Sequence, residues 1–254
     1  MHKAEDHHVL NDGQYGSRPH RNATDPVFLE ELQLEISRAT RKPLVLTNYD
    51  AAACYDRIIP SVGMLVSRKF GVPKQVTTMN AATLENAEYR IRTDLGLANT
   101  GYSHSASHPI YATGQGSANS PAIWCFLSSA LFDGYDTVAE QAMYSSAYGE
   151  VHQRLGLIGF VDDCNGQTNQ FPYPVTTDTV PQLLTQAQSN AQHWSDLLQA
   201  SGGALELSKC SCHVVNWAFN THGKPFLASK NSAHQDYLQV EDSLSNTTHS
   251  LQLI

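Results

Sequence analysis

Apolar residues recur along the chain with two different periods, and each period predicts one kind of element. The clearest helical stripe follows Asp178 and Pro181 and ends at Gly202-Gly203, two residues that commonly stop a helix. Its apolar positions, three or four residues apart, are Val180, Leu183, Leu184, Ala187, Ala191, Trp194 and Leu198. This spacing predicts a long amphipathic helix whose apolar stripe faces the core.

A second amphipathic helix is predicted near the N-terminus. Asp25 is a suitable N-cap, and Pro26 then takes the first helical position. The apolar residues that follow at helical spacing, and are expected to be buried, are Phe28, Leu32, Ile36 and Ala39. Further helices are predicted over residues 60–70, 75–94 and 121–132.

Short apolar runs predict the strands. "KPLVLTNYD" ends on Asp50, and the run from Leu155 to Val161 leads into Asp162-Asp163, where a two-residue hairpin loop is expected. "CHVVNWAF" is the last predicted strand. The order helix, strand, helices, strand hairpin, helix, strands predicts an α+β fold, a small antiparallel sheet with helices packed on one face.

Composition narrows the class of protein. A chain of 254 residues can bury one sizeable core, and no apolar run reaches membrane-spanning length, so no membrane partner is expected. Five scattered cysteines, an odd number, predict reduced thiols and an intracellular protein, nuclear or cytoplasmic. The formal net charge of −8 counts against a phosphate-binding protein, which normally carries a basic patch.

Three carboxylates follow predicted strands: Asp50 after one, Asp162 and Asp163 after another. If the two strands are neighbours, like charges converge and raise one another's pKa unless a cation neutralises them. Oxygen ligands favour Mg²⁺, and a pair of such ions can activate an attacking oxygen and stabilise a leaving one. Acids that hold metal would also remove the charge objection. The alternative is that the aspartates only form turns.

Several short motifs occur in an order that changes this balance. In chain order they are "QYGSRPHRNATD", "DAAACYD", "GQGSANSP", "FVDD" and "GGALELSKC" with the strand through Trp217, and they extend from Gln14 to Phe226. Singly they are weak, but together they resemble the motifs of reverse transcriptases, RNA-directed DNA polymerases. The segment "QYGSRPHRNATD" resembles the stretch upstream of the first catalytic motif in the non-LTR retrotransposon branch.

The resemblance implies a polymerase-type palm with a two-metal site. Asp50 and Asp162 would bind both Mg²⁺ (or Mn²⁺) ions, Asp163 would lie beside them in a lesser role, and the main-chain carbonyl of Ala51 would be an extra ligand. Tyr55 falls at the position of the family's steric gate, where a ring occupies the space that a ribose 2′-OH would need. Without the motif, Tyr55 would be an ordinary core aromatic.

The same resemblance implies a dNTP, an RNA template and a DNA primer as partners. Gln115 and Gly116 would line the incoming nucleotide and template, and Lys209 would stabilise the pyrophosphate leaving group, unless it is simply a solvated lysine. Arg18 and Arg21 either contact template phosphate or belong to a solvated loop.

The pattern departs from the family at both ends. Residues 1–43 are interpreted as a remnant of the fingers with a connecting helix, 44–226 as the palm, and 227–254 as an irregular extension in place of a thumb. We therefore expect weak or no polymerase activity from this chain alone.

Alternative functions remain open. The chain could be a catalytically silent remnant that binds nucleic acid or a protein. A phospho-acceptor signalling domain also uses an acidic pair, another Asp and a Lys, but in the reverse order. RNA-templated RNA synthesis requires a second Asp where this chain has Tyr55. A zinc site at Cys210, Cys212 and His213 is disfavoured because strand alternation places His213 opposite the cysteines.

Overall fold

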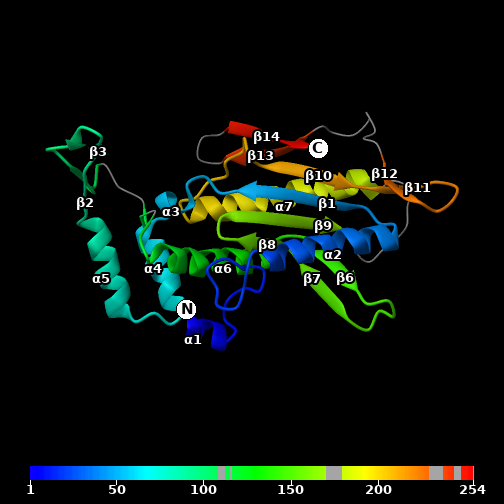
Figure 1. Ribbon diagram of the computed structural model, residues 1–254, viewed down its shortest axis with the longest axis horizontal. Coiled ribbons are helices and arrows are strands. Elements are labelled where there is room, and N and C mark those ends of the chain that lie inside the picture. Colours follow the sequence, from blue (N-terminus) through cyan, green and yellow to red (C-terminus); the bar gives the residue numbers. More distant parts are fainter. Residues whose placement is uncertain (108–111, 115, 170–178, 229–236, 243–246, 254) are drawn as a thin grey trace.

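The computed structural model describes residues 1–107, 112–114, 116–169, 179–228, 237–242 and 247–253 (Figure 1). Its centre is a six-stranded sheet in the order β13-β14-β10-β1-β9-β8. These strands are β1 (Leu44–Asp50), β8 (Leu157–Phe160), β9 (Asp163–Asn169), β10 (Ser211–Val215), β13 (Tyr237–Asp242) and β14 (Thr247–Leu253). The helices are α1 (His2–Asp6), α2 (Thr24–Thr40), α3 (Cys54–Arg57), α4 (Pro60–Lys69), α5 (Lys74–Glu85), α6 (Ser120–Val138) and α7 (Thr179–Ala200).

Strand β1 lies in the middle of the sheet, antiparallel to both β9 and β10. Only the β10–β14 pair is parallel among the described strands. The predicted α+β class is confirmed. The prediction that residues 227–254 are irregular is wrong for β13 and β14, which pair with each other and extend the sheet beyond β10. Their pairing is made across the fold, so local periodicity did not indicate it.

Helices cover both faces of the sheet, whereas the sequence predicted one. Thr168 accepts a hydrogen bond of 3.0 Å from Asn190 of α7, and Asn165 donates one to Glu30 of α2. Thr168 and Asn165 are three residues apart on β9, and strand residues separated by an odd number point to opposite faces. Helices α6 and α7 therefore cover one face, while α2 runs along β8 and β9 on the other (Figure 1).

The core lies between the sheet and helices α6 and α7. Trp194 of α7 is 2% exposed and contacts Tyr49, Phe132 and Tyr135, with ring centroids 6.4, 5.5 and 6.3 Å away. The apolar stripe predicted on this helix, from Leu183 to Leu198, is buried against the sheet as expected. Burial of these large rings is the main favourable contribution to folding.

Helix α2 is turned the other way from its prediction. Phe28 and Leu32 are 66% and 44% exposed, while Gln33 and Ser37 are buried. The sheet face beneath α2 is itself polar, because Asn165 and Gln167 point toward it. A polar helix face packs there, and the hydrogen bond from Asn165 to Glu30 offsets part of the burial of its polar groups. Asp25 lies inside the helix, not at the cap, and accepts a 2.9 Å bond from the Asn22 amide.

A small lobe projects from α4 (Figure 1). Its helix α5 ends at Glu85, so the helix predicted over 75–94 is too long. The chain turns after Thr93, whose hydroxyl accepts a hydrogen bond from the Leu95 amide at 3.2 Å, and Gly96 adopts a φ of +123° that suits glycine. The short strands that follow are β2 (Glu88–Tyr89), β3 (Arg92–Thr93), β4 (Gly96–Leu97) and β5 (Tyr102–Ser103).

Two more hairpins flank the main sheet. They are β6 (Ala142–Ser145) with β7 (His152–Leu155), and β11 (Trp217–Phe219) with β12 (Pro225–Leu227). Gly156 separates β7 from β8, so the single apolar run of the sequence becomes two strands. None of the helices that the structure describes has the length and apolarity needed to cross a membrane.

The position of the core can be tested with two leucines. Leu198 on α7 is fully buried, whereas Leu65 on α4 is 66% exposed. We expect Leu198→Ala to lower the free energy of unfolding by about 2–5 kcal/mol, because it leaves a cavity, and Leu65→Ala to change it by less than about 0.5 kcal/mol. Urea denaturation followed by circular dichroism measures both. Equal effects would contradict this packing.

Candidate active site at the acidic strand ends

The sheet register brings the predicted acidic residues together. Asp50, the last residue of β1, lies directly opposite Asp163, the first residue of β9. Asp162 precedes Asp163 in the turn from β8. The Cα atoms of residues directly opposite each other on neighbouring antiparallel strands are about 4.5–5.5 Å apart. The strand expected to adjoin β1, the one that leads into Asp162, is β8, and β9 separates it from β1. The acids come together because β9, the returning strand of the hairpin, pairs with β1.

The hairpin turn differs by one residue from the predicted one. Phe160 pairs with Asp163, so the two turn residues are Val161 and Asp162, not the two aspartates. Val161 has a φ of +61°, a region that β-branched residues rarely adopt. Such a backbone persists only where its surroundings hold it in place.

Two distant parts of the chain hold this turn. The Val161 carbonyl accepts hydrogen bonds from Trp124 Nε1 at 2.6 Å and from Gln14 Nε2 at 3.3 Å. Gln14 is fully buried and also donates to the Ser128 hydroxyl at 2.8 Å. Gly16 lies so close that a Cβ atom there would be 2.2 Å from the Val161 nitrogen.

These supporting residues were not identified from the sequence. Gln14 and Gly16 open the motif "QYGSRPHRNATD", which was the one available signal, but nothing in the motif shows that it reaches the turn. Arg18 of that motif is also buried. Its guanidinium donates to both oxygens of Glu5 and to the carbonyls of Asn11 and Gln14, so it faces neither solvent nor a phosphate site.

The carboxylates crowd one another. Burial raises the pKa of the Asp163 carboxyl, the charges of Asp162 and then Asp50 raise it further, and Lys209 opposes the shift. Lys209 Nζ lies 3.5 Å from Asp50 Oδ1, but its side chain is 64% exposed. An exposed pair of this kind contributes little. Lys209 therefore offsets only part of the repulsion between the acids.

Two further side chains lie beside Asp162. Burial, then the charge of Asp162, raises the pKa of the Cys54 thiol to about 12, so this thiol stays protonated at neutral pH. Burial, Cys54 and Asp162 in turn raise the pKa of Tyr55. The Tyr55 ring meets Trp124 edge to face, with centroids 6.4 Å apart. Tyr55 is only half-buried, so it borders the acids and is not a fully enclosed core residue.

The loop before α6 is tied to the same place. The Thr113 amide donates to the Tyr55 carbonyl at 2.9 Å, and the Ser120 hydroxyl donates to the Thr113 and Gly114 carbonyls. Gly116 has a φ of +91°, and nothing lies within 4 Å of the position its Cβ would take. Gln115 falls outside the described residues. The structure thus brings Gly116 into the loop that borders Tyr55.

Ala51, the residue after β1, forms one further β-bridge. It pairs with Leu205, and the Asp50 carbonyl accepts a 2.8 Å hydrogen bond from the Glu206 amide. The segment that carries Lys209 is thereby attached to the end of β1. The role of the Ala51 carbonyl as a ligand stays a prediction.

The acids suit a divalent cation in their chemistry, since they offer oxygen only and their crowding would be relieved by positive charge. Among the described residues, however, no three His, Cys, Asp or Glu side chains lie close enough to hold an ion by themselves. Mg²⁺ commonly uses one or two carboxylates and completes its shell with water and substrate phosphates. Asp50 and Asp162 with a nucleotide would meet that requirement.

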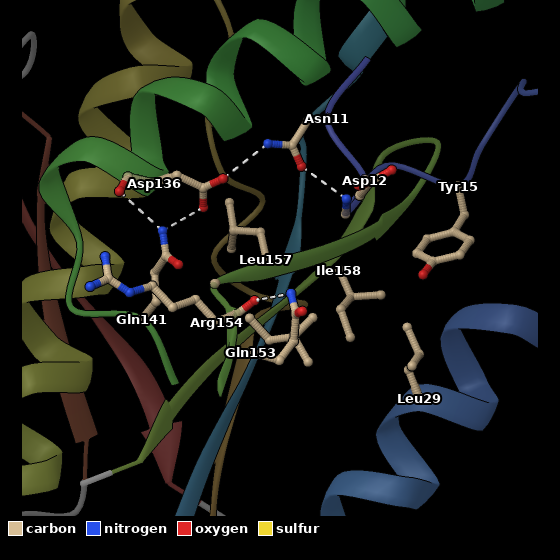
Figure 2. Close-up of a pocket in the computed structure, with 13 residues that line it drawn as sticks. Asn11, Asp12, Tyr15, Leu29, Asp136, Gln141, Gln153, Arg154, Leu157 and Ile158 are labelled. Carbon is tan, nitrogen blue, oxygen red and sulfur yellow. Dashed lines mark hydrogen bonds between the residues drawn. The ribbon is translucent and has the colours of Figure 1, made fainter. Parts of the chain in front are cut away.

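A separate cavity of about 590 Å³ lies along β8, away from the acids (Figure 2). Tyr15, Leu29 and Ile158 line one part of it. The Asp136 carboxylate in its wall accepts hydrogen bonds from Asn11 at 3.0 Å and Gln141 at 2.7 Å. Burial raises the pKa of Asp136, although the bond from Asn11 opposes this shift. This carboxylate is paired within the fold and belongs to none of the sequence motifs.

Comparison with solved structures identifies the architecture. The telomerase of Candida tropicalis in complex with a fragment of telomeric RNA superposes with a TM-score of 0.52 at 13% identity, covering 92% of this chain and 36% of that one. The apo telomerase of Candida tropicalis gives 0.50 at 12%, covering 98% and 39%. The fold is reverse transcriptase-like. No family model and no curated protein matches the sequence.

The likeness has a clear extent. The chain spans little more than a third of the telomerase chains, and at this identity the comparison establishes the reverse transcriptase-like fold alone. The non-LTR branch is not supported by it. The acidic pair is therefore assessed from its own geometry.

Asp163→Asn should stabilise the protein at neutral pH. The pKa of Asp163 is raised in the folded state, so its ionised form opposes folding above that pKa, and stability rises as pH falls through it. We expect a gain of up to about 0.5 kcal/mol at pH 7, reduced by salt and lost toward pH 3. Urea denaturation at several pH values measures the gain. Lower stability of the variant at pH 7 would contradict the repulsion.

Proposed function

We propose that this chain is the palm of an RNA-directed DNA polymerase that adds dNTPs to a primer. The observation that supports it most is the register pair of Asp50 and Asp163, with Asp162 in the adjoining turn, at the end of the central strands of a reverse transcriptase-like fold. A fold by itself does not specify function, but acids brought together at the strand ends of such a fold favour this reaction class.

In this proposal Asp50 and Asp162 hold Mg²⁺ or Mn²⁺, and Asp163 lies beside them. When bound, the ions supply the positive charge that activates the primer 3′-oxygen and stabilises the phosphates. The held turn at Val161 keeps Asp162 in position, since Trp124 and Gln14 both bind its carbonyl. Lys209, next to Asp50, is free to swing toward the leaving pyrophosphate because its side chain is mostly exposed.

The nucleotide would lie over Tyr55 and the loop before α6. The Tyr55 ring would exclude a ribose 2′-OH, and Gly116, which has open space at its Cβ position, would let the backbone approach the base. Gln115 and the Ala51 carbonyl complete the proposed contacts. The telomerase in the comparison is in complex with telomeric RNA. By analogy we propose RNA as the template here, with a DNA primer.

A second candidate is a catalytically silent relative that binds nucleic acid or a protein. Two observations favour it: Lys209 lies at 3.5 Å from Asp50, and the described side chains form no preassembled ligand set. The chain also spans little more than a third of the telomerase chains. In this candidate the Asp50 carboxylate stays paired with Lys209 and holds no metal ion.

Substitution of the acids distinguishes the two candidates. We expect Asp50→Asn and Asp162→Asn each to reduce primer extension on an RNA template by about 10²-fold or more, because each removes a metal ligand. Asp56→Asn is the matched control, since Asp56 is an exposed carboxylate of the same motif. Primer extension is measured with Mg²⁺ and with Mn²⁺.

A binding measurement accompanies the activity. Trp124 donates to Val161 in the acidic turn, so paramagnetic Mn²⁺ bound there with a dNTP should quench its fluorescence. The quench should disappear in Asp50→Asn, Asp162→Asn and Trp124→Phe, and persist in Asp56→Asn. A quench without extension supports the silent candidate. Extension unaffected by both acid substitutions would exclude the polymerase assignment.

Tyr55 provides a test of sugar selection. We expect Tyr55→Ala to raise incorporation of rNTPs relative to dNTPs by about 10- to 100-fold, because the space beside Trp124 becomes open to a hydroxyl. Tyr55→Phe keeps the ring and should keep the selectivity. Single-nucleotide incorporation with each triphosphate measures the ratio. An unchanged ratio in Tyr55→Ala would remove Tyr55 from the site.

A further inference from the structure

The projecting lobe is less acidic than the rest of the chain. Residues 70–107, from the end of α4 to the last small hairpin, contain three Lys or Arg and three Asp or Glu. The rest of the chain contains thirteen and twenty-one. Arg68 and Lys69, in the last turn of α4, add two positive charges where the lobe begins. A nucleic acid therefore meets less repulsion at the lobe than on the acidic remainder of a protein whose net charge is −8.

The lobe also presents an aromatic pair. Tyr89 and Tyr102 lie opposite each other on β2 and β5, with ring centroids 5.5 Å apart and planes at 20°. Tyr102 is 57% exposed, which is unusual for a stacked ring. An exposed ring supported from behind by a second ring is a suitable platform for a nucleobase, because bases stack on aromatic side chains without regard to sequence.

Two arginines, Arg90 and Arg92, follow Tyr89 closely in the sequence. Arg90 follows Tyr89 directly and pairs with Glu88 at 2.9 Å, while its side chain stays 44% exposed. Arg92, on β3, is exposed and makes no ion pair within the described part of the chain. A guanidinium beside a stacking ring can bind the phosphate next to the stacked base.

The lobe lies beyond the end of β1 that carries Asp50 (Figure 1). Figure 1 shows β1 pointing toward α3 and the lobe, with Asp50 at its end. The lobe extends from α4 beyond this end of the sheet. A single strand that enters or leaves the acidic site on this side would meet the lobe.

We propose that the Tyr89–Tyr102 pair with Arg92 forms a binding surface for single-stranded RNA, with Tyr102 stacking on a base and Arg92 contacting a phosphate. The inference rests on the proposed function, since it gives the template a second contact outside the acidic site. Stacking and charge do not distinguish one base sequence from another, so the surface should bind single-stranded RNA of any sequence. Its affinity for single-stranded DNA should be no higher than its affinity for RNA.

The lobe also exposes apolar residues, which favour a different kind of partner. Ile91, Leu95 and Leu97 are 64%, 101% and 58% exposed and would suit a protein partner. The aromatic stack, the arginines close to it in the sequence and the place of the lobe beyond the end of β1 favour nucleic acid. A protein partner is accordingly an outcome that the experiment can reveal.

Fluorescence anisotropy tests the surface directly. The full chain is titrated against a labelled RNA of about 20 nucleotides without self-complementarity, in EDTA and at about 50–200 mM KCl. We expect Tyr102→Ala to weaken binding by about 10-fold or more, and Tyr102→Phe to retain it. Arg92→Gln should weaken binding and reduce the slope of log affinity against log salt by about 0.7.

Matched variants control for general effects. Tyr148→Ala removes a tyrosine that is 90% exposed on the β6–β7 hairpin, and Arg154→Gln removes an exposed arginine from β7. Both should bind RNA like the wild type. Circular dichroism confirms that the lobe variants are folded, which is expected because Tyr102 and Arg92 are exposed.

The outcomes are separable from those for polymerase activity. EDTA removes any metal, so RNA binding is measured without the ions on which primer extension depends, and Asp56→Asn, outside both sites, should bind RNA as the wild type does. RNA affinity of Tyr102→Ala and Arg92→Gln within twofold of the two controls would overturn the surface. No RNA binding by the wild type would do the same, and self-association that depends on Leu95 would then identify a protein contact.

Discussion

The hydrogen-bonded register of β1 with β9 is the constraint on which the site depends. It places Asp50 opposite Asp163 and leaves Asp162 in the turn. A shift of one residue would reverse the faces of the strand that moves, so that Tyr49 of β1 or Cys164 of β9 would leave the core and the neighbouring acid would enter it. The register is therefore determined by the apolar residues that alternate with the acids. Burial around Trp194 outweighs a repulsion that costs little at an exposed edge.

The acidic turn is supported from two sides. Its left-handed Val161 would be strained alone, and it is held by Trp124 of α6 and by Gln14 of the N-terminal segment. Arg18 fixes that segment to Glu5 and to its own carbonyls. The N-terminal motif therefore has a structural role at the site, which explains why it accompanies the other motifs. Rigid support of this kind is what a site needs to keep charged groups in one geometry.

Acidic charge is unevenly distributed over the molecule. Outside the lobe, the chain carries 21 of its 24 acidic residues against 13 basic ones, whereas the lobe, residues 70–107, carries three of each. The lobe also presents an exposed ring pair. A net charge of −8 therefore does not exclude contact with nucleic acid, because the acidic excess lies outside the lobe. The interface under α2 is polar as well, and Gln33 and Gln167 are buried there without partners in the described structure.

Much of the fold was determined by the sequence alone. The period of 3.6 predicted α7 and its buried stripe, and the apolar runs before Asp50 and Asp162 predicted β1 and β8, because both signals are local. Tertiary structure decided what local pattern cannot contain. It turned the apolar stripe of α2 to solvent because the sheet beneath is polar, added β13 and β14 across a long connection, and gave Gln14 and Arg18 their roles. These features depend on contacts between residues far apart in the chain, and such contacts leave no periodic trace in the sequence.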